Sequence, residues 1–117
     1  MIRVTFLREQ GRLVGFDCKG HADYAEQGQD IVCSAVSVLA QTAVLGLVQV
    51  AHIPAGYAIE EDGGLHCILG RDATEEQCKE AELLLKTLSA GLHAVDESYP
   101  GYLKFCLLYT SDAADEL

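Results

Sequence analysis

Positive charge is scarce in this sequence. Its 117 residues include 8 lysines and arginines against 18 aspartates and glutamates, which gives a formal net charge of −10 at pH 7. A protein that binds nucleic acid through its phosphates needs a basic face, so this balance argues against that class. An acidic surface can instead speed the encounter with a basic protein partner. Net charge of this kind also serves solubility alone.

The cysteines show no pattern of a disulfide framework. Their number, five, is odd, no C-x-x-C pair occurs, and no signal peptide is evident before them. Unpaired thiols are typical of a reducing compartment, so we expect a cytoplasmic protein. Four of them fall in expected strands or on the apolar stripe of a helix, where cysteine acts as a small core residue. These four are Cys18, Cys67, Cys78 and Cys106.

Charged side chains are absent from residues 31–59, a stretch long enough to cross a bilayer. Several features count against a membrane span. Ser34, Ser37 and Gln41 form a polar face at helical spacing, a proline and a glycine interrupt the run, and no cluster of lysine or arginine flanks it. We therefore expect a buried helix of a soluble protein that does not act at a membrane.

Periodicity predicts two hairpins, two helices and a last strand. Alternating apolar residues indicate the strands, and apolar residues at three- and four-residue steps indicate the helices. Asp30 is a good N-cap for the first helix, and Thr74 with Gln77 makes a capping box for the second. The expected strands are 2–8, 13–19, 57–60, 65–69 and 102–107, and the expected helices are 31–50 and 75–97.

The resulting element order is ββαββαβ. Helices that pack on a mainly antiparallel sheet define an α+β fold. We expect a single domain over residues 1–107. Residues 108–117 end the chain in a small, acidic segment without a core face, which is expected to be a disordered tail outside the domain.

The candidate catalytic residues lie in GHADYAEQGQDIVCSAVS, residues 20–37. His21 ends the second strand, and Cys33 falls in the first turn of the following helix. There, free backbone N–H groups and the helix dipole favour a thiolate over a thiol. An imidazole that takes the proton completes the pair needed for nucleophilic acyl transfer. The alternative for Cys33 is a buried thiol without a role, because free cysteine is among the most buried residue types.

Neighbours of Cys33 are candidates for supporting roles. Asp30 either caps the helix or orients the imidazole of His21, and the N-cap preference of aspartate favours the cap. The backbone N–H groups of Cys33 and Ser34 are candidate donors for an oxyanion hole. Ser37 lies one turn beyond Cys33, where it either supports the site or bonds back to its own helix.

The polar loop between His21 and the helix follows Gly20 and contains Ala22 and Gly28. Backbone freedom at the two glycines would let this surface loop swing over a peptide, exclude water and bring the imidazole toward the thiol. The plainer alternative is an ordinary surface connection.

A zinc site is the chemical rival to acyl transfer. Cys18, His21 and Cys33 supply three ligand types, but their spacing matches no common zinc pattern and no fourth ligand is evident. No glycine-rich phosphate loop is present in the sequence either. We therefore expect no metal and no cofactor.

The sequence resembles the ribosomal-processing cysteine proteases, small bacterial enzymes that trim an N-terminal extension from a large-subunit ribosomal protein. The resemblance covers residues 1–105. It is carried by GHA at 20–22, DIVC at 30–33, AVS at 35–37, LAQT at 39–42 and YPGY at 99–102.

This resemblance implies a cysteine endopeptidase in which Cys33 is the nucleophile and His21 the general base, with a mobile segment between them. It implies as substrate a basic ribosomal protein with a short hydrophobic N-terminal extension, cut after an aromatic residue. It also implies a homodimer, to which the apolar first helix can contribute. A function of another class stays open, a non-catalytic module that binds ribosomal protein or assembly intermediates.

Overall fold

The computed structural model describes residues 1–26 and 30–109. These residues form the ββαββαβ order expected from the sequence, with a short π-helical segment after the first helix. The strands are β1 (Ile2–Glu9), β2 (Arg12–Lys19), β3 (Ala55–Ile59), β4 (Leu65–Leu69) and β5 (Leu103–Tyr109). The helices are α1 (Ile31–Leu45), its π-helical continuation η1 (Gly46–Val50), and α2 (Glu75–Ser98).

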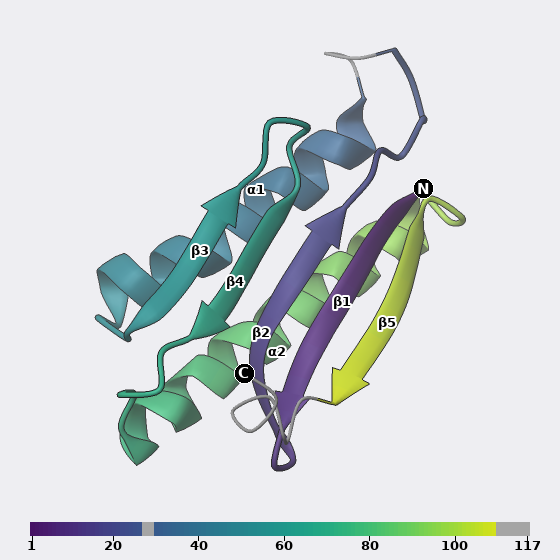
Figure 1. The fold of residues 1–117 in the computed structure, drawn as a ribbon. Helices are drawn as coiled ribbons and strands as arrows, with labels where there is room; N and C mark the ends of the chain where they lie inside the picture. The colour runs from purple at the N-terminus through teal and green to yellow at the C-terminus, as the bar shows by residue number, and fades with distance from the viewer. Residues whose placement is uncertain (27–29, 110–117) are drawn as a thin grey trace.

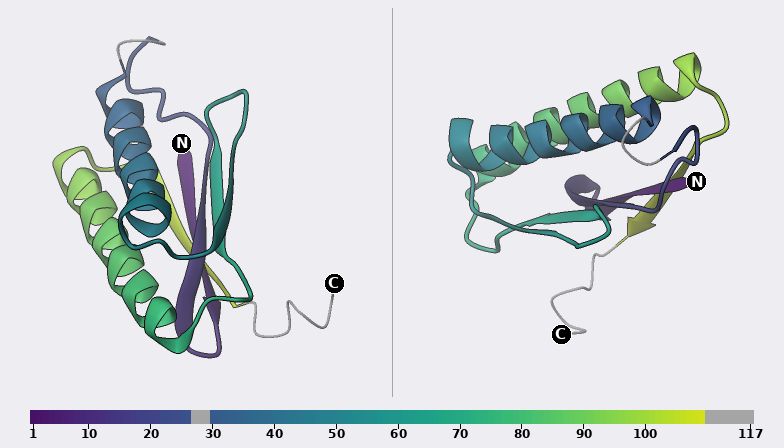
Figure 2. Two further views of the ribbon diagram at one scale, coloured as in Figure 1. Left: turned by 90° about the vertical axis from the view of Figure 1, so that its left-hand side faces the viewer. Right: turned by 90° about the horizontal axis from the view of Figure 1, so that it is seen from above.

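The strands form one mixed sheet in the order β3-β4-β2-β1-β5. Neighbouring strands pair antiparallel except for β1 and β5, which run parallel with Ile2 opposite Leu103. Helices α1 and α2 lie side by side on the same face of the sheet (Figure 1, Figure 2). The predicted α+β fold with a mainly antiparallel sheet is confirmed. Because β2 lies at the centre of the sheet, the residues that follow it emerge beside the start of α1.

Local sequence signals fix the ends of these elements. The turn between β1 and β2 consists of Gln10 and Gly11, whose φ angles are both positive, 52° and 79°. Such angles are typical of tight hairpin turns. The Thr74 hydroxyl accepts from the Gln77 N–H at 3.1 Å, and the Gln77 side chain accepts from the Thr74 N–H at 2.9 Å. The predicted capping box of α2 is therefore confirmed.

Cysteine burial follows the prediction at two positions. Cys18 and Cys67 lie in the core, where burial raises the pKa of Cys18 to about 12 and that of Cys67 to about 11. Both thiols therefore stay protonated at neutral pH. Cys78 and Cys106 are only half-buried, and all five cysteines of the chain are free.

Helix α1 is apolar but only partly buried. Over Ile31–Val50, α1 and η1 have a mean hydropathy of 2.1, which by length and composition alone would suffice to cross a membrane. Val32 and Val36 on the inner face are buried in the core shared with the sheet and α2. On the outer face Val38 is 63% exposed and Val50 is 77% exposed. The prediction of a helix buried on several sides is wrong for this outer face, because α2 and the sheet cover the inner side.

Strand β5 reaches Tyr109, beyond the predicted end of the domain. It pairs with β1 over its whole length, with Leu7 opposite Leu108 and Arg8 opposite Tyr109. Residues 108 and 109 therefore belong to the sheet rather than to a disordered tail. The remainder of the predicted tail, residues 110–117, lies outside the described residues.

Candidate active site

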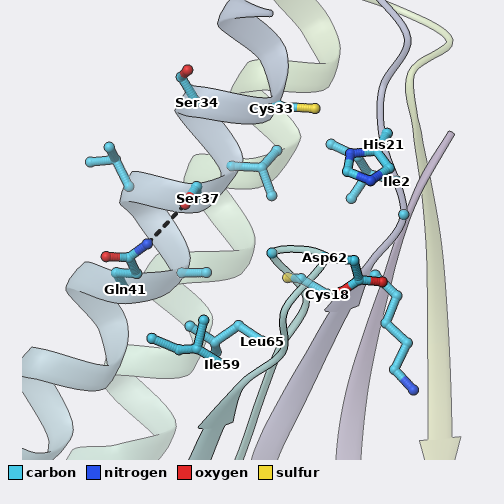
Figure 3. A pocket seen from close by; sticks show the side chains of 16 residues that line it. Ile2, Cys18, His21, Cys33, Ser34, Ser37, Gln41, Ile59, Asp62 and Leu65 are labelled. Atoms are coloured by element: carbon cyan, nitrogen blue, oxygen red, sulfur yellow. Dashed lines mark hydrogen bonds between the residues drawn. The ribbon is translucent and has the colours of Figure 1, made fainter. Parts of the chain in front are cut away.

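The end of β2 and the start of α1 meet at one hollow. His21 follows β2, Cys33 lies in the first turn of α1, and both side chains line a cavity of about 380 Å³. The sulfur of Cys33 points from the helix toward His21 (Figure 3). Among the residues that the structure describes, no hydrogen bond joins the imidazole to the thiol. The two candidate groups therefore share a cavity without being directly bonded in this arrangement.

The sulfur of Cys33 has one close backbone partner. The N–H of Ala22 donates to Cys33 Sγ at 3.2 Å, and such a donor stabilises a thiolate more than a thiol. Ala22 itself is buried, with 4% of its surface exposed. The prediction that Ala22 lies in a surface loop is therefore wrong, because its methyl group joins the core and its N–H faces the sulfur.

Gly20 has a structural reason to be glycine. Its φ angle is +96°, and a Cβ atom placed on it would lie 2.5 Å from the backbone oxygen of Met1. A larger residue would therefore strain the backbone and push β1 away from the segment that carries His21. Gly28, the other glycine predicted to give this loop freedom, lies outside the described residues.

Asp30 is held by backbone N–H groups on both sides. Its Oδ1 accepts from the Cys33 N–H at 3.0 Å, which confirms the predicted N-cap, and its Oδ2 accepts from the Tyr24 N–H at 2.9 Å. Burial opposes ionisation of this carboxyl, but the hydrogen bonds from Cys33, Tyr24 and Ala25 outweigh it and hold the pKa of Asp30 below its usual value. Asp30 thus joins the loop after His21 to the start of α1.

The predicted supporting groups on α1 already form hydrogen bonds within the protein. The N–H of Cys33 donates to Asp30 Oδ1, and the N–H of Ser34 donates to the Asp30 carbonyl at 3.1 Å. Neither is therefore a free oxyanion donor in this arrangement. The Ser34 hydroxyl bonds back to the same carbonyl at 3.1 Å. The Ser37 hydroxyl accepts from the Gln41 side chain at 2.9 Å on the cavity-facing side of the helix (Figure 3).

The electrostatics at Cys33 differ from the prediction. Burial raises the pKa of the thiol, the Ala22 N–H lowers it, and the carboxylates of Asp30 and Asp23 raise it further, so that the pKa of Cys33 ends above its usual value. The prediction that the helix start favours the thiolate is therefore wrong for this arrangement. At neutral pH the resting Cys33 side chain is therefore held mainly as the thiol.

Replacing Asp30 by asparagine is expected to lower the pKa of Cys33. Asparagine keeps an amide oxygen to accept from the Cys33 N–H, so the cap persists, while the acceptor for the Tyr24 N–H and the negative charge that disfavours the thiolate are removed. The rate of iodoacetamide labelling at Cys33, followed against pH by peptide mass spectrometry, should shift to lower pH. Asp72→Asn, at an exposed turn before α2, is the matched control and should leave the profile in place. A profile that stays or moves to higher pH in Asp30→Asn contradicts this electrostatic account.

Two cavities of different character meet at Cys33 and His21. The first extends along α1 and is mostly apolar, with Ile59 and Leu65 of the β3–β4 hairpin on its border, although polar and charged side chains also line it (Figure 3). The second, also about 380 Å³, is bordered by four acidic side chains. These are Asp23, Asp30, Glu61 and Asp62. A chain that crosses Cys33 thus meets an apolar surface on one side and a negative one on the other.

Asp62 is a site residue that the sequence did not predict. It lies in the turn between β3 and β4 and, like His21, borders both cavities; Figure 3 shows both residues at the first cavity. Its Oδ1 accepts from the Gly64 N–H at 3.0 Å, which fixes the turn. The sequence identified this segment only as a turn, because its position beside β2 depends on the long-range order of the strands.

No set of metal ligands is found for the zinc alternative among the described residues. Within residues 1–26 and 30–109, no three side chains of histidine, cysteine, aspartate or glutamate come together as metal ligands. Cys18, one of the three residues considered for zinc, is in the core at 6% exposure.

Cysteine proteases react through a cysteine that a nearby histidine activates, and Cys33 and His21 are candidates for this pair because they share a cavity. In this structure they lie on an α+β domain of two helices and a mixed sheet. The family model described as cysteine protease Prp matches residues 1–104, and the chain belongs to this family of cysteine proteases. The resemblance found in the sequence is thereby confirmed.

Curated relatives support the same conclusion. The ribosomal processing cysteine protease Prp of Bacillus subtilis is 28% identical over 106 residues, which cover 89% of this chain and 95% of the relative. The protein of the same name from Staphylococcus aureus is 27% identical over 93 residues, covering 80% of this chain and 85% of the relative.

Solved structures share the fold. A crystal structure from Streptococcus mutans has a TM-score of 0.75 and 31% sequence identity, and covers 93% of this chain and 95% of that one. The processing protease Prp from S. aureus, solved with a covalently linked product peptide, has a TM-score of 0.79 at 24% identity, and covers 92% of this chain and 99% of that one.

Proposed function

We propose that this protein is an endopeptidase that removes a short hydrophobic N-terminal extension from a large-subunit ribosomal protein. The observation that carries the proposal is the position of Cys33 and His21 at the junction of an apolar and an acidic cavity. The names of the relatives from B. subtilis and S. aureus, both ribosomal processing proteases, support this substrate class.

In the proposed mechanism, His21 takes the proton from Cys33 as the thiol attacks the scissile carbonyl. The imidazolium then gives that proton to the leaving amine, which leaves an acyl group on the sulfur. Water, deprotonated by His21, attacks the thioester, the C–S bond breaks to free the carboxylic acid product, and the proton on His21 returns to the sulfur. Because the pKa of Cys33 is raised at rest, little thiolate exists before substrate arrives. The contribution of the imidazole to the reaction rate is therefore larger here than in a cysteine–histidine pair that is already ionised.

The two cavities fit the two parts of such a substrate. The apolar cavity, with Ile59 and Leu65, suits the hydrophobic extension. The acidic cavity, with Asp23, Glu61 and Asp62, suits the basic body of the protein that follows the cut. The peptide would then lie with its N-terminal part along α1 and its C-terminal part toward the loop and hairpin tip.

The test is cleavage of a synthetic peptide that carries a hydrophobic segment, an aromatic residue and then several lysines. We expect one cut after the aromatic residue, read by mass spectrometry. A matched peptide with glutamines in place of the lysines should be cut with a higher KM, and the difference should shrink as salt is added. A peptide that binds but stays intact under all conditions would favour the alternative of a non-catalytic binding module.

We also propose that the protein is cytoplasmic and forms a homodimer. Free cysteines, none of them paired, suit a reducing compartment.

The exposed apolar side of α1 borders an open groove against α2, about 620 Å³ in volume, that includes Ile31, Val38 and Val95. Such a surface suits the same surface of a second copy. Sedimentation equilibrium should give twice the monomer mass, and a monomer at all concentrations would remove the dimer from the proposal.

A further inference from the structure

Three tyrosines from distant parts of the sequence meet beside the candidate active site. Tyr24 belongs to the loop after His21, whereas Tyr99 ends α2 and Tyr102 precedes β5. The Tyr24 ring lies edge-on to both others, with centroids 5.4 Å from Tyr99 at 83° and 5.2 Å from Tyr102 at 73°. Edge-to-face geometry at these distances is favourable for aromatic rings. The YPGY motif at 99–102 thus contacts the loop that carries the candidate base.

Tyr24 is held by its backbone as well as by its ring. Its N–H donates to Asp30 Oδ2 at 2.9 Å, and Asp30 caps the helix that carries Cys33. Two residues earlier, the Ala22 N–H donates to Cys33 Sγ at 3.2 Å. The segment from His21 to Tyr24 is therefore held to the start of α1 by its backbone, and to the α2–β5 turn by the Tyr24 ring.

The turn that carries Tyr99 and Tyr102 is hydrogen-bonded to the start of the chain, which also contacts His21. Gly101 has a φ of +93°, an angle that glycine adopts easily, and this allows the chain to reverse between the rings. The carbonyl of Tyr102 accepts from the Ile2 N–H at 2.9 Å, and the amino group of Met1 donates to the carbonyl of His21 at 2.5 Å. The start of β1 therefore links the turn to the residue that carries the imidazole.

We propose that Tyr99 and Tyr102 are positioning residues, which act through Tyr24 to keep the segment after His21 seated against Cys33 and Asp30. When the rings are in place, the Ala22 N–H faces the sulfur and His21 lies at the cavity shared with Cys33. Without them the loop loses its ring contacts and keeps its backbone hydrogen bonds, the burial of Ala22 and the ion pair between Asp23 and the Met1 amino group. The structural part of this inference concerns the loop itself, and its catalytic part rests on the proposed peptidase function.

Amide hydrogen exchange, resolved by residue, tests the structural part without any substrate. In the wild-type protein the N–H groups of Ala22 and Tyr24 should be protected, because both are hydrogen-bonded. In Tyr102→Ala, protection of both should fall by about tenfold or more, whereas Tyr102→Phe, which keeps the ring, should retain it. Tyr109→Ala removes an exposed tyrosine at the other end of β5 and should change neither amide. Unchanged protection in Tyr102→Ala overturns the proposal, whatever the protein cleaves.

Kinetics test the catalytic part. Tyr102→Ala should lower kcat by about tenfold or more with KM changed by less than about threefold, because a displaced base slows chemistry more than binding. Tyr102→Phe, which keeps the ring, should keep the wild-type kcat. Tyr24→Ala and Tyr102→Ala should not be additive, so that the double variant has about the kcat of the slower single variant. All variants are compared at a temperature where their near-UV circular dichroism matches that of the wild type.

The outcomes separate this inference from the proposed function. Loss of amide protection with an unchanged kcat overturns the catalytic role of the tyrosines while leaving the peptidase intact. If the wild type cleaves no peptide, the proposed function fails, and hydrogen exchange still decides whether the tyrosines seat the loop. A fully additive double variant contradicts action through Tyr24.

Discussion

Replacing Cys33 by alanine is expected to abolish peptide cleavage while peptide binding persists. Removal of a catalytic nucleophile typically lowers kcat by about 10⁴-fold or more, since only binding and polar stabilisation remain. Alanine at this position loses only the sulfur and its contact with the Ala22 N–H, and it is a good helix former. The fold should therefore persist, and peptide affinity measured by fluorescence anisotropy should stay within about threefold of wild type.

The chain offers a control for this experiment. Cys78 is also a half-buried helical cysteine, but it lies in α2 and borders neither of the two cavities at Cys33. Cys78→Ala should keep the wild-type rate. Cleavage by Cys33→Ala at more than about a hundredth of the wild-type rate would show that another group is the nucleophile.

Replacing His21 by alanine is expected to have the second largest effect. A positioned general base typically contributes about 10² to 10⁴ in rate. Here the contribution should lie in the upper part of that range, because burial and the carboxylates of Asp30 and Asp23 raise the pKa of Cys33 and leave little thiolate without a base. The alanine variant should bind peptide normally and cleave it slowly.

The pH profile of the His21→Ala variant should identify the role of the imidazole. Without a base, the rate depends on spontaneous ionisation of Cys33, so kcat should rise as pH increases toward the raised pKa of the thiol. The wild type should already reach its plateau at lower pH, because the imidazole takes the proton within the complex. His66→Ala on β4, which borders neither cavity at Cys33, is the control. Equal rates and equal profiles for wild type and His21→Ala would remove His21 from the mechanism.

Local features of the fold were well predicted from the sequence. The caps at Asp30 and Thr74 and the hairpin turn at Gln10 and Gly11 depend on residues within a few positions of one another. Periodicity likewise placed all seven strands and helices in the right order. The same local pattern brought His21 near Cys33, since the strand end and the helix start are joined by a short loop.

The features that were missed depend on contacts between distant segments. Asp62 borders the site because β4 pairs with β2, and Tyr24 is anchored because the α2–β5 turn lies beside the loop. The exposed outer side of α1 follows from both helices lying on the same face of the sheet (Figure 2). None of these arrangements leaves a periodic signal in the sequence.

The electrostatic prediction at Cys33 failed for a different reason. The helix start does supply N–H groups, but Asp30 occupies those of Cys33 and Ser34. The cap that makes the helix begin there also places a negative charge beside the sulfur, and burial adds to the effect. A dipole argument based on position alone therefore gave the wrong sign for the pKa shift.

The most direct test of the central claim is to locate the covalent adduct formed by a substrate peptide that ends in a chloromethyl ketone at the scissile position. In a cysteine protease the catalytic thiolate displaces chloride from such a reagent and forms a stable thioether. Peptide mapping should find a single adduct on the sulfur of Cys33, formed much more slowly in His21→Ala. An adduct on any other residue, or loss of peptide cleavage while Cys33 stays unmodified, would contradict the account.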